Sequence, residues 1–339
     1  MSGPRSAADP QPGRALPGLD LGRLRGYLDR EAPDLVDGPL RGGVLPGGKS
    51  NLTYAVTDGR TRFVVRRPPL GHVLATAHDM GREYRVQRAL APTPVPVPRV
   101  LLHCPDAKVI GAPFYLMSHV DGRVYRVPAE LTPLGPAAVA GLARSLVHTL
   151  ADLHAVAPDS VGLADFGRPD GFAARQVRRW KTQLDASRSR DLPGIEELHD
   201  RLAAAVPVAG AATVVHGDFR LDNAVVGPDG DIRAVLDWEM STLGDPLTDL
   251  GLLLVYSARL HAPGWPAPDE LAVAYADRTG RDVRDLGWYV AFASFKLAVI
   301  LEGVHYRYVR GQTVGAGFDR VGERVPPLIA QGLSTLGES

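Results

Sequence analysis

The hydrophobic pattern of this 339-residue chain changes its period near residue 120. Before that point, apolar and polar residues alternate over short runs such as 52–57, and Asp58-Gly59 predicts a tight hairpin turn between two strands. From about residue 131, apolar residues recur at helical spacing, most clearly over 137–156. The pattern therefore predicts an α+β chain with a small antiparallel sheet first and a larger, mainly helical part after it.

The remaining elements follow from the same two periods. In the first part we expect helices at 20–36 and 75–90, and strands around a glycine-rich loop at 43–50, at 63–65, at 99–103 and at 114–120. In the second part we expect helices at 137–156, 171–187, 194–206, 268–280 and 286–311, with short strands at 214–215, 224–226 and 232–236. We find no internal repeat, and this order predicts two lobes.

The charges of the chain balance, with 38 basic and 38 acidic side chains, although only four of the basic residues are lysine. Neutrality argues against broad attraction to nucleic acid or anionic lipid, which needs an excess of positive charge. The single cysteine, Cys104, excludes an intrachain disulfide and a multi-cysteine metal site. No apolar run reaches the roughly 18 residues of a membrane span, and residues 1–18 lack the apolar core of a secretory signal. We expect a cytoplasmic protein, a monomer or homodimer, without nucleic-acid or membrane partners.

Residues 43–50 read GVLPGGKS and satisfy the G-x-x-x-x-G-K-[ST] pattern of a P-loop. A P-loop must open a helix, whereas the residues after this segment alternate like a strand and end in a hairpin turn. We therefore favour a glycine-rich hairpin that covers a nucleotide, as in kinases. Its small residues would let backbone N–H groups approach phosphate oxygens, and they are Gly47, Gly48, Ser50 and Asn51. An ordinary glycine-rich turn is the alternative.

The segment HGDFRLDN, residues 216–223, and the later segment VLDWE, residues 235–239, carry the strongest chemical signal. Phosphoryl transfer from ATP needs a carboxylate that orients or deprotonates the attacking hydroxyl, together with metal ions and cations around the phosphates. Asp218 and Asn223 place a base and a metal ligand on one loop. Asp237 supplies a further oxygen ligand of the kind that Mg²⁺ prefers.

These two segments resemble the aminoglycoside phosphotransferase family of kinase-like enzymes. The resemblance extends over about residues 20–320 and includes SNLTYAVTDGRTRFVVRRPP, GREYRVQRAL, VIGAPFYLMSHVDGRVY and FGRPDGFAARQVRRW. It is strongest with the kinase domain of acyl-CoA dehydrogenase family members 10 and 11 and with free-standing actinobacterial homologues. The resemblance implies a two-lobed protein-kinase-like fold with ATP and Mg²⁺ between the lobes.

The resemblance also implies roles for residues of the second lobe and its metal site. Asp218 would be the catalytic base, and Asn223 and Asp237 would bind Mg²⁺. His216 would be structural and would hold the catalytic loop by hydrogen bonds. Asp249 would brace the same loop through its backbone.

In the first lobe, the resemblance implies a nucleotide site. Glu83 would anchor the cation that binds the phosphates, and the linker backbone around Met117 and His119 would pair with adenine. Kinases place a lysine on the third strand, and this chain has Arg66 there. An arginine is always protonated and forks onto two oxygens, so it can hold phosphates and pair with Glu83. A nucleotide-binding pseudokinase without turnover is the non-enzyme alternative.

We divide the chain accordingly into a disordered arm at 1–18, a nucleotide-binding lobe at 19–118 and a catalytic and substrate-binding lobe at 119–339. The substrate would lie against helical segments at about 131–206 and 265–320. The candidate substrate residues are Arg179 and Trp180 in a basic stretch at 175–190, and Glu302, His305 and Tyr306 in the helix at 286–311. The simpler interpretation is that the first segment is a solvated helical face and the second a core helix.

The residues and the resemblance together predict an ATP- and Mg²⁺-dependent phosphotransferase that acts on a hydroxyl group of a small molecule. A basic stretch suits an anionic acceptor such as a hydroxyacyl-CoA better than an aminoglycoside, which is a polycation and needs carboxylates around it. An aminoglycoside, a choline-like compound or a sugar is the alternative acceptor, because the fold alone does not specify it.

Overall fold

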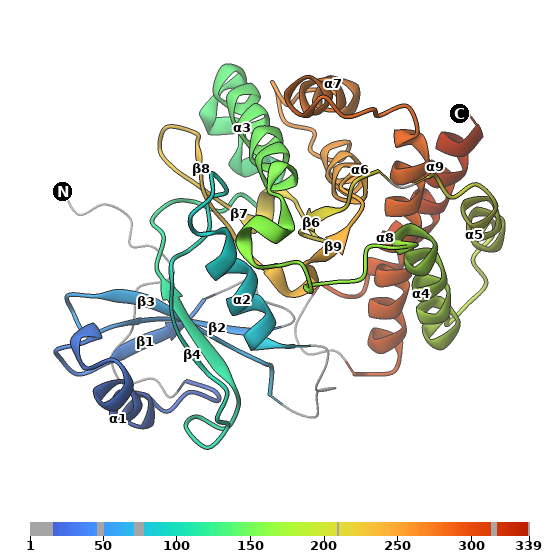
Figure 1. Ribbon diagram of the computed structural model, residues 1–339. Helices are drawn as coiled ribbons and strands as arrows, with labels where there is room; N and C mark the ends of the chain where they lie inside the picture. Colours follow the sequence, from blue (N-terminus) through green and yellow to red (C-terminus); the bar gives the residue numbers. More distant parts are fainter. Residues whose placement is uncertain (1–15, 46–50, 71–77, 209, 313–316, 338–339) are drawn as a thin grey trace. The chain divides into compact units, whose positions relative to one another are not determined.

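The structure is a computed structural model, and it describes residues 16–45, 51–70, 78–208, 210–312 and 317–337 (Figure 1). These residues form a five-stranded antiparallel sheet in the N-terminal part and mainly helices in the C-terminal part, which confirms the predicted α+β class. The chain divides into two compact units, Met1–Arg123 with Arg233–Glu239, and Val124–Ile232 with Met240–Ser339. The first unit therefore includes a short segment from much later in the sequence.

The first unit is built on one sheet with the strand order β1-β2-β3-β5-β4. Its elements are α1 (Leu21–Glu31), β1 (Arg41–Val44), β2 (Leu52–Thr57), β3 (Arg62–Arg67), α2 (Met80–Leu90), β4 (Val100–Cys104) and β5 (Phe114–Ser118). The hairpin between β2 and β3 turns at Asp58-Gly59, as the sequence predicts, with Gly59 at a φ of 102°. Asp58 Oδ1 closes this turn by accepting hydrogen bonds from Arg60 N at 2.9 Å and Thr61 N at 2.6 Å.

Alternate residues of β3 enter two different apolar clusters. Phe63 and Val65 belong to a cluster that also contains the buried leucines of α1. Val64 belongs instead to a cluster with Met80, the first residue of α2. Because side chains alternate along a strand, Arg66 lies on the same side of β3 as Val64, toward α2.

Residues 16–18, which the sequence assigns to a disordered arm, are held against the sheet of the first unit. The Tyr54 hydroxyl donates to the carbonyl of Pro17, and the Arg67 guanidinium donates to the carbonyl of Gly18. Residues 1–15 lie outside the described residues. The structured part of this unit therefore starts before residue 19, because strand side chains bind the backbone there.

The second unit is mainly helical (Figure 1). Its helices are α3 (Pro136–Ala155), α4 (Phe172–Ser187), α5 (Ile195–Ala204), α6 (Leu247–Ser257), α7 (Pro268–Thr279), α8 (Leu286–Val309) and α9 (Val325–Gly337). The short strands are β6 (Thr213–Val215), β7 (Ala224–Val226), β8 (Ile232–Val235) and β9 (Thr242–Gly244), which pair as β6 with β9 and β7 with β8. The boundary between the two units falls within β8.

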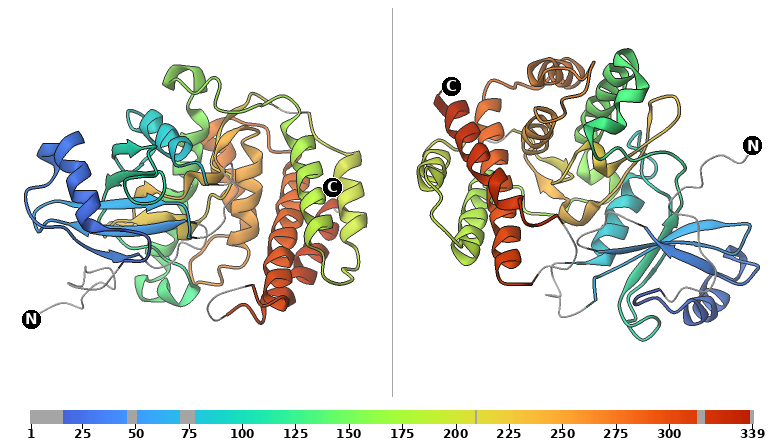
Figure 2. Two further views of the ribbon diagram at one scale, coloured as in Figure 1. Left: turned by 90° about the horizontal axis from the view of Figure 1, so that it is seen from below. Right: turned by 180° about the vertical axis from the view of Figure 1, so that it is seen from behind.

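The helix α8 packs against α4, α5, α6 and α9, and Figure 2 shows α8 and α9 side by side in both views. By length and composition, α8 could cross a membrane, contrary to the expectation that no segment is long and apolar enough. However, 67% of its most apolar 18-residue window is buried inside the protein, as in a core helix. The helices that pack around α8 thus bury most of its apolar surface.

The sequence pattern does not predict α6, α9 or β9. The helix α6 is buried on most sides, so it has no polar face whose period would mark a helix. The helix α9 starts with Val325 and two prolines and contains glycine, which lowers its local helix propensity. The strand β9 has only three residues, and its partner β6 lies far earlier in the sequence. Tertiary packing therefore decides all three elements.

Candidate active site

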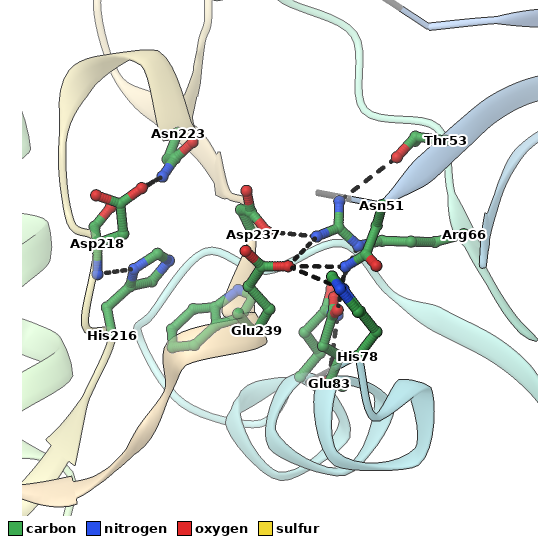
Figure 3. Close-up of polar contacts among 12 residues, drawn as sticks. Asn51, Thr53, Arg66, His78, Glu83, His216, Asp218, Asn223, Asp237 and Glu239 are labelled. Carbon is green, nitrogen blue, oxygen red and sulfur yellow. Dashed lines mark hydrogen bonds and ion pairs between the residues drawn. The ribbon is translucent and has the colours of Figure 1, made fainter. Parts of the chain in front are cut away.

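One guanidinium, that of Arg66, lies among three carboxylates in the first unit (Figure 3). Its Nε lies 2.8 Å from Glu83 Oε2, and its Nη2 pairs with Asp237 Oδ1. The third carboxylate is Glu239, whose Oε2 lies 4.0 Å from the same Nη2. A strand, a helix and the segment after β8 supply these side chains. We call this group the Arg66 cluster.

The charges of the Arg66 cluster do not balance. Three carboxylates face one guanidinium, which leaves two negative charges when all of them are ionised. Burial raises the pKa of Glu83, and Arg66 opposes that rise. The Tyr115 hydroxyl also donates to Glu83 Oε2 at 3.0 Å. The excess negative charge suits a site that takes up a further cation.

Asp237 has an unusual backbone conformation. Its φ is 67°, the one positive value among the described residues other than glycine. The next residue, Trp238, is buried, and its indole Nε1 donates to Val235 O at 2.9 Å. A positive φ costs energy in a residue with a side chain, and such strain gathers at functional sites. The turn brings both Asp237 and Glu239 toward Arg66 (Figure 3).

Asn51 connects two carboxylates of the cluster. Its Nδ2 donates to Glu83 Oε1 at 3.0 Å and to Glu239 Oε2 at 2.9 Å, and the residue is buried. An amide nitrogen carries two hydrogens, so one donor group can satisfy both contacts. Asn51 therefore ties the start of β2 to α2 and to the segment after β8.

Asn51 is the only described member of the predicted phosphate-binding loop. The other members, Gly47, Gly48 and Ser50, lie outside the described residues. The strand β2 begins at Leu52, so a strand and not a helix follows the loop. The P-loop interpretation is therefore wrong, because that motif holds phosphate at the start of a helix.

The predicted adenine linker lies at the end of β5, in the first unit. Met117 is buried in the cluster that also contains Val64. His119 follows the strand, and its backbone N–H donates to Arg62 O at 3.4 Å. Burial, together with the nearby Arg62, lowers the pKa of the His119 imidazole. Hydrogen bonding to the neighbouring strand thus fixes the backbone of this segment.

The second unit holds the loop 216–223, which runs from β6 to β7 and which we call the catalytic loop. Asn223 Nδ2 donates to Asp218 Oδ2 at 3.0 Å and to Asp218 O at 2.9 Å (Figure 3). Asp218 N donates to His216 Nδ1 at 3.2 Å. The side chain and backbone of Asp218 are therefore held by residues of its own loop.

Asp249, on α6, holds the catalytic loop from outside. Its two carboxylate oxygens accept from His216 N at 2.6 Å and from Gly217 N at 2.8 Å. Burial raises the pKa of this carboxyl, but the hydrogen bonds, with His154 first among them, prevail and lower it. Gly217 has a φ of 83°, and an added Cβ would lie 2.7 Å from Met240 O, so only glycine fits there.

Two cations at the catalytic loop were not among the predicted site residues. Arg220 has Nη2 2.5 Å from Asp222 Oδ2 and Nε 3.6 Å from Asp218 Oδ2. Lys296, on α8, donates from Nζ to Gly217 O at 2.6 Å. Arg220 lies inside the HGDFRLDN motif, so the motif itself marks it. Lys296 is one of four lysines and stands in an otherwise apolar segment, which is the signal that could have identified it.

Of the candidate substrate residues, Trp180 and Arg179 on α4 lie near the catalytic loop. Lys296 Nζ lies 5.6 Å from the centre of the Trp180 ring, and the Arg179 guanidinium lies 5.7 Å from it. Trp180 is buried, and its Nε1 has no hydrogen-bond acceptor among the residues that the structure describes. Two cations thus share one aromatic ring close to the Gly217 carbonyl.

The other candidate substrate residues occupy different surroundings. Glu302 is buried, and its Oε1 accepts from Ser189 Oγ at 2.7 Å while its Oε2 accepts from Arg190 Nε at 3.1 Å. This carboxylate therefore anchors the segment after α4. The imidazole of His305 packs against Gly322, and Tyr306 stacks with the Arg310 guanidinium at 4.5 Å. All three residues thus have contacts within the second unit, and their role toward a substrate stays a prediction.

This chain is similar to a family of phosphotransferases and to one part of a longer protein. The sequence pattern of the phosphotransferase enzyme family matches residues 43–289. Acyl-CoA dehydrogenase family member 11 of Gallus gallus is 36% identical over 339 residues, which cover 93% of this chain and 43% of that protein. The chain therefore spans less than half the length of this relative.

Two solved structures show the fold. A protein of Ralstonia eutropha, provisionally assigned as an aminoglycoside phosphotransferase, is 32% identical with a TM-score of 0.83, over 94% of this chain and 98% of that one. The aminoglycoside phosphotransferase APH(4)-Ia, in a ternary complex with AMP-PNP and hygromycin B, is 15% identical with a TM-score of 0.61, over 93% of this chain and 98% of that one. The second likeness concerns the fold alone. Since the kinase-like fold is confirmed and the family pattern covers most of the sequence, the chain belongs to the phosphotransferase enzyme family.

Proposed function

We propose that this phosphotransferase moves the γ-phosphoryl group of ATP to a hydroxyl group of a small molecule. The observation that carries the proposal is the fixed position of Asp218, whose Oδ2 accepts from Asn223 on a loop that Asp249 holds by its backbone. The AMP-PNP complex of APH(4)-Ia supports ATP as the donor.

Asp218 would act as the base. The acceptor oxygen attacks the γ-phosphorus, its proton passes to the Asp218 carboxylate, and the bond between phosphorus and the bridging oxygen of ADP breaks. Asn223 keeps the carboxylate in one orientation during this step, since its amide binds both the side chain and the carbonyl of Asp218. Positioning of this kind is a large part of catalysis by kinases.

Mg²⁺ fits the residues present. Asn223 uses its Nδ2 on Asp218, which leaves its amide oxygen as the ligand that it can offer. Asp237 belongs to the Arg66 cluster, whose excess negative charge a divalent cation would offset. The described part of the chain holds no group of three or more His, Cys, Asp or Glu that could bind a metal. Phosphate oxygens and water would therefore complete the ligands, as is usual for Mg²⁺, and the ion would neutralise charge on the phosphates.

Arg66 would bind the phosphates of ATP. Its Nε is held by Glu83, and its Nη2 is paired with Asp237. In the nucleotide complex, Arg66 would donate to phosphate oxygens in place of Asp237. Its contact with Glu83 would keep the guanidinium in position. This arrangement gives Arg66 the task that lysine has in kinases, with a forked instead of a point-like donor.

A hydroxyacyl compound, such as a hydroxyacyl-CoA, is the acceptor that we favour. The relative of 36% identity carries the name acyl-CoA dehydrogenase family member 11, and an acyl-CoA is a thioester of an acyl group. Arg179 and the buried indole N–H of Trp180 lie near the catalytic loop, and they are donors that suit carbonyl or carboxylate oxygens. Like charges would disfavour a polycation at the same place.

An aminoglycoside, or another small molecule such as a choline-like compound or a sugar, is the second candidate. The protein of 32% identity over 98% of its length, provisionally assigned as an aminoglycoside phosphotransferase, favours it. A pseudokinase that binds the nucleotide without turnover is the alternative of a different class. The sequence weighs against a pseudokinase because the base and both metal ligands that the family resemblance implies are present, as Asp218, Asn223 and Asp237.

The test is an assay of ADP release from ATP and Mg²⁺ against a panel of 4-hydroxybutyrate, 4-hydroxybutyryl-CoA, kanamycin, choline and glucose. The matched variant is Asp218→Asn, which keeps the shape and removes the base. We expect acceptor-dependent ADP release that is lost in Asp218→Asn, with nucleotide affinity retained. Nucleotide binding without turnover across the panel would instead identify a pseudokinase, and a kanamycin-dependent signal would identify the second candidate.

A further inference from the structure

A buried cation in α8 has no part in the mechanism proposed above. Lys296 is 9% exposed, and its direct neighbours in α8, Phe295 and Leu297, are apolar and buried. Moving an ammonium group out of water is costly unless hydrogen bonds or opposite charges compensate. Asp218 and Asp249 favour the charged form, whereas burial opposes it and lowers the pKa of Lys296. Because burying its ammonium group costs free energy, we expect Lys296 to have a specific role.

The hydrogen-bond acceptor of Lys296 locates that role. Nζ donates to Gly217 O at 2.6 Å, and Gly217 immediately precedes Asp218. The carbonyl of Gly217 and the N–H of Asp218 belong to one planar peptide unit. The N–H end of that unit is bound by His216 Nδ1 at 3.2 Å. Lys296 and His216 therefore hold opposite ends of the peptide plane that leads into the Cα of Asp218, the atom that carries its side chain.

The preceding peptide plane is held as well. Gly217 N donates to Asp249 Oδ1 at 2.8 Å, so both planes that meet at Gly217 are fixed by charged groups. This matters because Gly217 has a φ of 83° and lacks the side chain that would otherwise restrict rotation. Without the contact from Lys296, the plane between Gly217 and Asp218 has a hydrogen bond at one end only.

The Trp180 ring covers the ammonium group. Its centre lies 5.6 Å from Lys296 Nζ, a distance at which the face of an indole attracts a cation. The contact joins α4 to α8 and limits the directions that the long lysine side chain can take. Two helices of the second unit, α4 and α8, thus help to fix the position of the Gly217 carbonyl.

We propose that Lys296 is a positioning residue for phosphoryl transfer, which fixes the peptide plane between Gly217 and Asp218 and thereby the direction of the Asp218 carboxylate. This inference rests on the proposed function, in which Asp218 is the base. It assigns Lys296 an action through Asp218, with no contact to substrate.

The first experiment compares Lys296→Met, which keeps length and removes the donor, with Lys296→Arg and with the control Lys108→Met. Lys108 is exposed between β4 and β5, in the first unit. We expect Lys296→Met to lower kcat by about 10- to 100-fold, in line with the cost of a misplaced catalytic group, while KM for ATP changes by less than about 2-fold. Lys296→Arg should recover part of kcat. An equal change in Lys108→Met, or a rise of KM with kcat unchanged, would overturn the inference.

The second experiment is a double-mutant cycle with Asp218→Asn. If Lys296 acts through Asp218, Lys296→Met should reduce the residual rate of Asp218→Asn by less than about 2-fold. A further loss equal to that seen in the wild-type background would show independent action and contradict the proposal.

The third experiment does not depend on activity. Hydrogen–deuterium exchange of peptides covering 214–223 is measured in wild type, Lys296→Met, Lys296→Arg and Lys108→Met. We expect faster exchange in this segment for Lys296→Met alone, because one end of the peptide plane is released. Unchanged exchange would refute the positioning role even if the enzyme has no measurable turnover. Absence of Asp218-dependent turnover in the wild-type protein, with exchange altered as expected in Lys296→Met, would refute only the proposed function.

Discussion

Arg66 decides the chemistry of the first unit at the scale of one residue. Its guanidinium pairs with Glu83 and Asp237 at once, which the single ammonium of a lysine would do with less geometric control. The chain has 34 arginines and four lysines, so an arginine at this position follows its general composition. The substitution of arginine for the kinase lysine is therefore compatible with an active enzyme.

Arg66→Ala should destabilise the first unit and impair turnover. It leaves three carboxylates without their cation, and breaking a buried ion pair in this way costs about 3 kcal/mol of unfolding free energy. We expect urea unfolding to show that loss and kcat/KM for ATP to fall by about 100-fold or more. The control is Arg62→Ala, since Arg62 pairs with Asp121 at the exposed surface, where a pair contributes less than about 1 kcal/mol. Unchanged kcat/KM in Arg66→Ala would show that another cation holds the phosphates.

Asp58 gives the stability of the hairpin a pH dependence. Burial raises its pKa, but backbone N–H groups of Asp37, Thr61 and Arg60 prevail and lower it from 3.8 to about 2. Since the pKa is lower in the folded state, the stabilisation is complete above about pH 4 and is lost as pH falls toward 2. We expect Tm to fall less steeply between pH 4 and 2 in Asp58→Asn than in wild type. Parallel curves for the two proteins would show that Asp58 makes no such contribution.

At the scale of elements, each candidate cluster is assembled from segments that are distant in the sequence. The catalytic loop carries Asp218 and Asn223, but α6 and α8 supply the Asp249 and Lys296 that hold its backbone. In the first unit, Asn51 at the start of β2 bridges α2 and the segment after β8. Loops provide the reactive groups here, and helices fix where those groups lie.

Asn51→Asp should weaken nucleotide binding more than Asn51→Ala does. The aspartate would put a fourth carboxylate beside Glu83 and Glu239, where like charges repel, whereas alanine only removes the bridge. We expect KM for ATP to rise by about 10-fold or more in Asn51→Asp and by less in Asn51→Ala. Isothermal titration with AMP-PNP checks the same order without turnover. Equal affinities in both variants would mean that charge at this position does not matter.

At the scale of the whole molecule, the two compact units contain different halves of the proposed chemistry. The first holds the Arg66 cluster with Asp237, and the second holds the catalytic loop with Asp218 and Asn223. Asp237 belongs to the first unit because the whole segment Arg233–Glu239 does, although the chain before Arg233 and after Glu239 belongs to the second unit.

Mg²⁺ should stabilise the protein only together with nucleotide. The described residues offer no complete set of metal ligands, so phosphate oxygens have to contribute. We expect Mg²⁺ alone, or EDTA alone, to shift Tm by less than about 1 °C, and Mg²⁺ with AMP-PNP to raise it by several degrees, because a ligand stabilises the state that binds it. Differential scanning calorimetry checks this, and a large shift with Mg²⁺ alone would point to a metal site made by the protein itself.

Local sequence patterns are enough to predict the class of the fold, most of its elements and the residues with the clearest chemical identity. Alternating and helical periods mark the sheet and the amphipathic helices, and the HGDFRLDN and VLDWE segments mark Asp218, Asn223 and Asp237, because these signals are local. The P-loop interpretation could be rejected from the strand pattern that follows it. The same periods do not predict the apolar helix α6, because it lacks a polar face.

Which side chains meet depends instead on long-range packing. Lys296 reaches Gly217 across 79 positions, Asn51 reaches Glu239 across 188, and Glu302 is withdrawn into contacts with the segment after α4. No local pattern carries these contacts, since they depend on how helices pack and on where the chain returns to the first unit. Burial then fixes their chemistry, because removing water makes each charge depend on the partners that the fold brings to it.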